Sequence, residues 1–398
     1  MQNAATIIVI IIAVITALSY NWIDESITIY GFRRPDIKPY EGGKCRVIEG
    51  IETCEDIVIH HRTGHAFMAC GDKTIRSQVF YPPINLITDT TQLIRDTPYI
   101  YDINNDKLIP LELKNFPPEE DFLLCGMGIY EDEKNEPNKL YVFFTNHKKT
   151  GSVIEIFEHI LNTNELVHLS TVKNDLIITP NDVVPVSKDE FYVTNDHGHE
   201  TGFWREFGDI TRRPWGNVVF HSSITNTTEI VADSIRYPNG ITSNWDNSKI
   251  YVGTSAGGEL LIYDRKSNNK LHLSESLFTG LSIDNISVDE QTGEIYCAAT
   301  QKPLAALVYM RDRTGTAPPQ PAAIIKVSNN TAEDKFYGIK YSQKIIFEDN
   351  GSILPSVSIA TADRQRNVML LGTFRGDGIA RCELESLIEI NWFQHVEL

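Results

Sequence analysis

The sequence predicts an all-β protein, a six-bladed β-propeller with a hydrophobic helix at its N-terminus. Three features support this fold class. Few long periodic helices follow residue 40. A sequence phrase recurs instead, made of a polar turn, a strand, another turn and a second strand. Pairs such as Asn-Gly and Thr-Gly separate the β-branched and aromatic runs. The phrase occurs in residues 61–72, 136–159, 187–196, 245–265, 290–310 and 364–384.

These six units predict a single domain over residues 40–398. They give about 60 residues per unit, slightly more than the roughly 40 to 50 of a typical propeller blade, as long loops would produce. A β-sandwich is the structural alternative. The near-constant repeat favours closure into a ring, because each blade can bury its faces only against the next blade.

Residues 1–22 are expected to form a signal peptide or a signal-anchor. The apolar run 4–18 is about 15 residues long, which is short for a helix that spans a membrane. If the run is retained, Tyr20 and Trp22 suit a membrane or lipid interface. Either outcome directs the protein to the secretory pathway, secreted or membrane-anchored, with the propeller on the extracellular or lumenal side.

Composition excludes one class of partner and one kind of metal site. The chain has 53 Asp and Glu residues against 36 Lys and Arg, and this net charge of −17 repels nucleic acid. Its six cysteines contain no CxxC unit, which argues against a zinc site. Sequence alone does not pair them, but Cys70 and Cys297 lie inside apolar strands and are interpreted as buried thiols.

Several polar residues lie in or beside apolar strand patterns, about once per repeat unit. They are Glu55-Asp56, Asn181-Asp182, Asn195-Asp196-His197, Asn239 and Asp284-Asn285. In a propeller this placement directs side chains to the central channel, where clustered carboxylates are costly unless a cation satisfies them. The oxygen donors and the lack of a Cys or His cluster favour calcium. Taken singly, Asn239-Gly240 also reads as a turn and Asn181-Asp182 as a local side-chain bond.

Two sequons are expected to carry glycans, which would make the protein a glycoprotein. Asn226 and Asn350 have polar, loop-like surroundings. Asn285 also begins a sequon, but it lies beside Asp284 between apolar neighbours. We therefore interpret Asn285 as an inward-facing ligand.

The phrases GIETCEDIVI, PNDVV, YVTNDH, YPNGI, DNISVDEQTGEIY and the closing RCEL resemble the paraoxonase/arylesterase family of six-bladed propellers, which is related to gluconolactonase-like propellers. The resemblance covers roughly residues 40 to 384. It implies two calcium ions, one catalytic and one structural, a retained hydrophobic N-terminus and hydrolysis of lactones and aryl esters. It also implies a disulfide between Cys45 and Cys382.

The resemblance also assigns roles by position. The catalytic calcium would be bound by Glu55, Asn181, Asn239, Asp284 and Asn285. The structural calcium would be bound by Asp56, Asp182 and the backbone carbonyl of Ile129. His147 matches the outer histidine of the family's catalytic pair, Asp196-His197 matches a supporting pair near the structural ion, and Asn350 falls where the family carries a glycan.

The match fails at the family's catalytic base. That base is a histidine in a His-Gly-Ile phrase, which reads Met127-Gly128-Ile129 here, and a thioether cannot accept a proton at neutral pH. A second channel histidine of the family corresponds to Thr300. His147 therefore lacks its neighbour and could serve as a structural or substrate-lining residue, which leaves Glu55 as an alternative base.

Two functions remain open from sequence. The first is a calcium-dependent arylesterase or lactonase of weak activity, with Asn181 donating a hydrogen bond to the oxyanion. Its substrates would be small-molecule esters or lactones. The second is a non-catalytic, membrane-anchored calcium-binding propeller that acts in protein assembly or binding.

Overall fold

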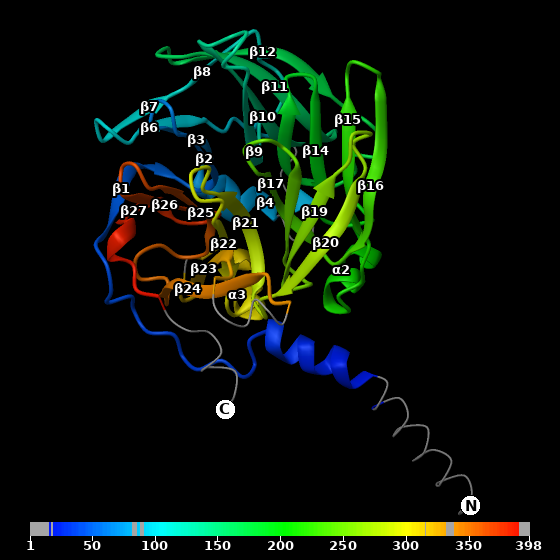
Figure 1. Cartoon of the computed structure of the whole chain (residues 1–398), viewed down its shortest axis with the longest axis vertical. Coiled ribbons are helices and arrows are strands. Elements are labelled where there is room, and N and C mark those ends of the chain that lie inside the picture. The colour runs from blue at the N-terminus through cyan, green and yellow to red at the C-terminus, as the bar shows by residue number, and fades with distance from the viewer. Residues whose placement is uncertain are drawn as a thin grey trace, which may run out of the picture.

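The computed structural model describes residues 16, 19–81, 86–87, 91–314, 316–331 and 338–389, and six sheets are arranged as blades around a central axis (Figure 1). The first sheet contains β2 (Cys54–His60), β3 (His65–Cys70), β6 (Tyr99–Asp102) and β7 (Lys107–Pro110). The second contains β9 (Leu124–Glu131), β10 (Lys139–Lys148), β11 (Gly151–Ile160), β12 (Glu165–Val172) and the short β8 (Glu112–Lys114).

The next three sheets follow one another along the chain. The third contains β13 (Pro180–Ser187), β14 (Glu190–Asn195), β15 (Gly216–Ser222) and β16 (Thr227–Ile235). The fourth contains β17 (Pro238–Ser243), β18 (Lys249–Thr254), β19 (Glu259–Arg265) and β20 (Leu271–Phe278). The fifth contains β21 (Ser282–Val288), β22 (Ile295–Thr300), β23 (Ala322–Asn329) and β24 (Tyr341–Asp349).

The sixth sheet joins both ends of the propeller. It contains β25 (Val357–Asp363), β26 (Val368–Thr373), β27 (Asp377–Glu383) and, as its outer strand, β1 (Cys45–Glu52). The innermost strands are β2, β9, β13, β17, β21 and β25, and each contacts the next around the ring, with β25 returning to β2. The predicted all-β six-bladed propeller is therefore confirmed.

The hydrophobic core lies between the blades. One cluster joins Val218 and Phe220 of β15 to Ile250 and Val252 of β18, which belong to neighbouring sheets. Another joins the first and second sheets through Phe67 and Val142. This arrangement follows from strands that carry apolar side chains on both faces, because each blade is covered on two sides.

Disulfides close the ring and brace its first blade. Cys45 and Cys382 are paired opposite each other on β1 and β27 and form a disulfide, as the resemblance implied. Cys54 and Cys70 form a second disulfide across β2 and β3, so the interpretation of Cys70 as a buried thiol is wrong. The sequence hid this pair because the two residues meet only when β2 and β3 fold back on each other. Cys297 is a buried free thiol, as predicted.

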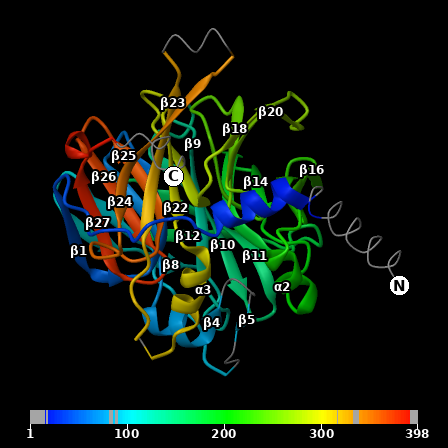
Figure 2. The same cartoon turned by 90° about the horizontal axis from the view of Figure 1, so that it is seen from below.

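Two helices, α2 (Phe203–Ile210) and α3 (Pro303–Arg311), lie on one face of the propeller, which we call the mouth face (Figure 2). A helix over residues 19–29 crosses above them in the same view, and its last residue, Ile29, lines the same pocket as Leu304 and Leu307 of α3. The π-helix η1 (Ile75–Val79) and the strands β4 (Phe80–Tyr81) and β5 (Leu86–Ile87) lie on the same side, and the 3-10 helix η4 (Leu384–Ser386) follows β27.

The predicted signal or anchor over residues 1–22 lies almost entirely outside the described residues. The part that is described, from Ser19 onward, begins the helix that packs on the mouth face. Within the described ranges, none of the helices combines the length and the apolar character needed to cross a membrane.

Candidate functional site

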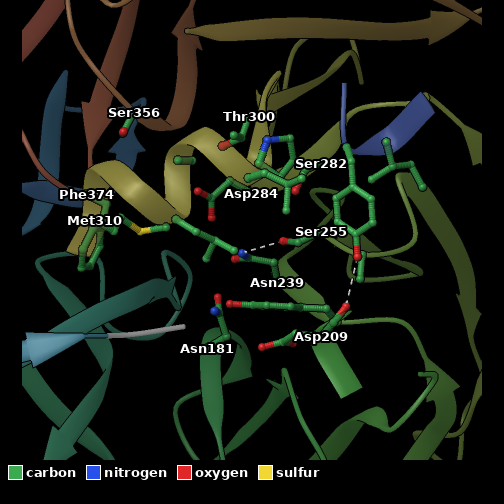
Figure 3. Close-up of a pocket in the computed structure, with 18 of the residues that line it drawn as sticks. Asn181, Asp209, Asn239, Ser255, Ser282, Asp284, Thr300, Met310, Ser356 and Phe374 are labelled. Atoms are coloured by element: carbon green, nitrogen blue, oxygen red, sulfur yellow. Dashed lines mark hydrogen bonds between the residues drawn. The ribbon is translucent and has the colours of Figure 1, made fainter. Parts of the chain in front are cut away.

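A pocket of about 220 Å³ opens on the mouth face at the beginnings of the inner strands, and we call it the mouth pocket (Figure 3). Five inner strands contribute Glu55, Cys125, Asn181, Asn239 and Asp284. Elements of the mouth face contribute an apolar wall of Ile29, Leu304, Leu307, Met310 and Phe374. Polar groups thus meet where the blades converge, and apolar groups lie toward the opening.

Four carboxyl and amide oxygens around this pocket are buried without a hydrogen-bond partner. They are Oε2 of Glu55 and the side-chain oxygens of Asn181, Asn239 and Asn285. The amide nitrogens of two of these residues are occupied: Asn239 donates to Ser255 Oγ at 3.0 Å and Asn285 donates to Glu55 Oε1 at 2.8 Å. A buried oxygen without a hydrogen-bond partner destabilises the fold. Because these four oxygens lie around one pocket, they indicate a binding site for a ligand that interacts favourably with several oxygen atoms.

Electrostatics favour a cation in this region. Burial, with the charges of Asp284 and Asp56, raises the pKa of Glu55 well above its usual range. Burial also raises the pKa of Asp284 and that of Asp56 to about 7, and the pKa of Asp182 well above its usual range. Burial and mutual repulsion therefore disfavour the ionised forms of these four carboxyl groups. A bound cation would stabilise those ionised forms.

The donor set fits calcium better than a transition metal. Within the described part of the chain, no group of three or more His, Cys, Asp or Glu side chains has the spacing of a metal site. The mouth pocket instead combines the carboxyls of Glu55 and Asp284 with the amides of Asn181, Asn239 and Asn285. Hard oxygen ligands of mixed charge suit calcium. The five residues predicted to share the catalytic ion are thus brought together.

The residues predicted for the structural ion, Asp56, Ile129 and Asp182, line a second cavity of about 400 Å³, and Asp56 and Asp182 directly follow Glu55 and Asn181 on β2 and β13. Here the carboxylate oxygens have partners. Asp56 accepts backbone hydrogen bonds from Ile57 and Met127, both at 2.8 Å, and Asp182 accepts them from Val183 and Ile241, both at 2.7 Å. The bonds from Met127 and Ile241 tie neighbouring blades together, and a second ion in this cavity stays a prediction.

Met127 does not lie in the mouth pocket. It lines the second cavity and packs in the core beside Phe144, whereas Cys125, two residues earlier on β9, lines the mouth pocket. The expectation that Met127 stands at the position of a catalytic base is therefore corrected, and Cys125 is the β9 residue at the site. Its thiol is inert as a base or nucleophile because burial raises its pKa well above its usual range.

His147 is also absent from the mouth pocket lining. Its Nδ1 lies 3.0 Å from Ser152 Oγ, and its ring stacks on Phe80 with centroids 5.4 Å apart. Burial lowers its pKa to about 4, so the imidazole is neutral near pH 7. Thr300, predicted to face the channel, does line the pocket.

The pair Asp196-His197 lies beside the mouth pocket, away from the cavity that contains Asp56 and Asp182. Its partners are on α2: Asp196 pairs with Arg205 at 3.1 Å, and His197 Nε2 hydrogen-bonds Asp209 Oδ1. The predicted position near the structural ion is corrected accordingly.

Two further pocket residues carried no signal in the sequence. Asp209 and Tyr237 both line the mouth pocket, but Asp209 ends a helix that has no metal or catalytic motif, and Tyr237 directly precedes a strand. The expected glycan acceptors differ in setting. Asn226 is an exposed turn residue between β15 and β16, whereas Asn350 is half-buried, and Asn285 is only 1% exposed, in line with an inward role.

Comparison with known proteins identifies the family. The family model described as arylesterase matches residues 36–384. Serum paraoxonase/lactonase 3 of Mus musculus is 26% identical over 85% of this chain and 88% of its own length, and serum paraoxonase/arylesterase 2 of Rattus norvegicus is 28% identical over 83% and 86%. A solved luciferin-regenerating enzyme shares the fold, with a TM-score of 0.52 and 14% identity over 88% of this chain and 98% of its own. Because the family model spans most of the sequence, this chain belongs to the arylesterase family.

Proposed function

We propose that this protein is a calcium-dependent hydrolase of lactones and aryl esters. The observation that carries the proposal is the set of four buried, unpartnered oxygens of Glu55, Asn181, Asn239 and Asn285. They surround a pocket whose opening is apolar, as a small ester with a polar carbonyl and a hydrocarbon body requires. Relatives named arylesterase and lactonase support the same reaction class.

The residues of the mouth pocket would have different roles in catalysis. Glu55, Asn181, Asn239, Asp284 and Asn285 would hold the ion. Calcium, when bound there, supplies a Lewis acid that polarises the scissile carbonyl. The Asn181 amide would donate a hydrogen bond to the developing oxyanion, and Glu55 is one candidate proton acceptor. The apolar wall around Leu307 and Met310 would hold the acyl or aryl group and exclude water.

The cellular setting follows from the same features. Two disulfides favour the oxidising secretory pathway, and the exposed Asn226 is the better placed of the two expected glycan acceptors. We propose a secreted or membrane-anchored protein with its propeller on the extracellular or lumenal side. A structural calcium held by Asp56, Asp182 and the Ile129 carbonyl belongs to this proposal.

A second candidate function is a non-catalytic calcium-binding propeller. The observation that favours it is that no histidine is present among the described residues that line the mouth pocket. Such a protein would bind calcium for stability and use its surface to assemble with other proteins.

The test is hydrolysis of a panel of lactones and phenyl acetate by the calcium-loaded protein and by Asn239→Ala. We expect turnover by the parent and a fall in kcat/KM of about 10²-fold or more in the variant, because one oxygen ligand of the ion is lost. The control is Asn164→Ala, which removes an exposed amide at the start of β12.

Thermal unfolding with calcium and with a chelator is measured on the same three proteins. A parent that is stabilised by calcium but hydrolyses none of the substrates would reject the hydrolase and support the binding propeller. A parent that hydrolyses them equally well with calcium and with the chelator would reject calcium dependence.

A further inference from the structure

Four interacting side chains lie beside the mouth pocket, and two of them, Arg205 and Asp209, belong to α2. Asp209 lines the pocket, and its side chain is 27% exposed. Its Oδ1 accepts a hydrogen bond from His197 Nε2. The other ring nitrogen of His197 lies 2.7 Å from Asp196 Oδ1, and Asp196 is paired with Arg205. The series runs Arg205, Asp196, His197 and Asp209, and Asp209 is the one that lines the pocket.

His197 is anchored to the strands that carry the proposed calcium ligands. Its backbone N–H donates to Thr179 Oγ1 at 3.0 Å, and Thr179 Oγ1 donates to the His197 carbonyl at 2.8 Å. Thr179 lies two residues before Asn181. On its other side the His197 ring contacts Tyr237 edge to face with centroids 4.5 Å apart, and Tyr237 lies two residues before Asn239. His197 is therefore held between the starts of β13 and β17, the strands that carry Asn181 and Asn239.

Neighbouring charged groups shift the pKa values of Asp196 and His197. Although burial would raise the pKa of Asp196, the charges of Arg205 and His197 hold it below its usual range. Burial would lower the pKa of His197, but the carboxylates of Asp196 and Asp209 outweigh it and raise that pKa. The imidazole thus lies between two carboxylates, with Nε2 hydrogen-bonded to Asp209 and Nδ1 close to Asp196.

The other candidate bases are worse placed. Glu55 Oε1 already accepts from Asn285, and its Oε2 belongs to the group of oxygens that would face the ion. His147 is stacked on Phe80 and does not line the mouth pocket, and the Cys125 thiol is held protonated by burial. Asp209 lines the pocket, is held by His197 and is not one of the proposed calcium ligands.

We propose that Asp209 is the proton acceptor for the attacking water, with His197 and Asp196 as positioning residues; this rests on the proposed hydrolase function. As the water oxygen bonds to the carbonyl carbon, one water proton moves to the Asp209 carboxylate. When the ester C–O bond breaks, the carboxyl group returns that proton to the leaving oxygen. The products are a carboxylic acid and an alcohol or phenol, or a hydroxy acid from a lactone, and Asp209 is regenerated.

The first variant is Asp209→Asn, which keeps the size of the side chain and removes its ability to accept a proton. We expect kcat to fall about 10²- to 10⁴-fold while calcium still raises the thermal unfolding temperature as in the parent. The matched control is Glu206→Gln, an exposed carboxyl on the same helix, which should leave kcat within twofold.

The second variant, His197→Gln, tests positioning through the pH–rate profile. Removing a side chain that can carry a positive charge beside the Asp209 carboxylate should move the acidic limb of kcat/KM to higher pH, which a purely structural role would not do. The titratable and charged groups that face this pair are Asp196, Arg205, Tyr237 and, from the N-terminal segment, Tyr30. An independent readout is ¹H–¹⁵N NMR of the imidazole, whose strongly downfield N–H signals should weaken in Asp209→Asn.

The outcomes separate this proposal from the function on which it rests. If the parent turns over and Asn239→Ala is inactive but Asp209→Asn retains full kcat, the hydrolase stands and Asp209 is not the base. If the parent is inactive toward every ester and lactone, the hydrolase itself is rejected, and the assignment of Asp209 with it. Loss of kcat in Asp209→Asn with unchanged calcium stabilisation supports both.

Discussion

At the residue scale, buried His147 makes stability depend on pH. Its folded pKa is lowered to about 4 by burial, against an ordinary value of 6.5. Between about pH 6.5 and pH 4, the unfolded chain therefore binds a proton at His147 that the folded chain does not bind. The free energy of unfolding falls as the pH is lowered through this range. Between pH 7 and pH 5 the loss is about 2 kcal/mol.

The variant His147→Gln lacks this linkage. We expect the difference in unfolding free energy between parent and variant to shrink by about 2 kcal/mol from pH 7 to pH 5, measured by urea unfolding in saturating calcium. The control is His272→Gln, which replaces a histidine that is exposed. A difference for His147→Gln that is equal at both pH values would contradict the assignment.

Residue types were predictable from sequence, but strand register was not. The oxygen donors were identifiable because polar side chains are unusual in apolar strands. Cys125 and Met127, however, are two residues apart in a stretch where the pairing of β9 with β10 is irregular, so the pattern does not say which of them reaches the mouth. Packing decides it: a Cβ on Gly126 would lie 2.4 Å from the Cα of Asp182, which fixes β9 against β13 at this point.

At the element scale, Arg212 holds the N-terminal helix on the mouth face. Its guanidinium donates to Ser26 Oγ at 2.9 Å and to the Ala256 carbonyl at 2.7 Å, and it lies 3.4 Å from Glu25. The helix in turn places Ile29 in the wall of the mouth pocket. A helix of this length is marginal alone, so these contacts determine whether it stays docked.

Replacing Arg212 by Gln should loosen that helix. We expect faster hydrogen–deuterium exchange in peptides covering residues 25–34, and a higher KM because Ile29 and Tyr30 would leave the pocket wall. The neighbouring Arg213→Gln is the control, since Arg213 contacts the Phe207 ring of α2 instead. Equal exchange in the two variants would show that Arg212 does not dock the helix.

Of the helices near the mouth pocket, only one at the N-terminus was predicted, and there is a physical reason. Strands in a propeller repeat, so their turns and alternation recur and can be recognised. The helix over residues 19–29 and α2 each occur once and depend on tertiary contacts such as Tyr30 with the Asp209 carbonyl. Without a repeat to compare, the sequence offered no reason to place Asp209 at the site.

At the scale of the whole molecule, ring closure and site assembly depend on different disulfides. The disulfide of Cys45 with Cys382 spans 337 residues and joins the outer strand of the last blade, β1, to its neighbour β27. The disulfide of Cys54 with Cys70 spans 16 residues and directly precedes Glu55 on β2. Closing the longer loop removes more entropy from the unfolded chain.

The two double variants should therefore differ in kind. Cys45→Ser with Cys382→Ser should lower the free energy of unfolding by about 5 kcal/mol, and Cys54→Ser with Cys70→Ser by about 3 kcal/mol. Because only the second pair adjoins Glu55, it should also weaken calcium binding in a titration. If both pairs reduce stability equally and leave calcium affinity unchanged, the propeller does not divide ring closure and site assembly between its disulfides.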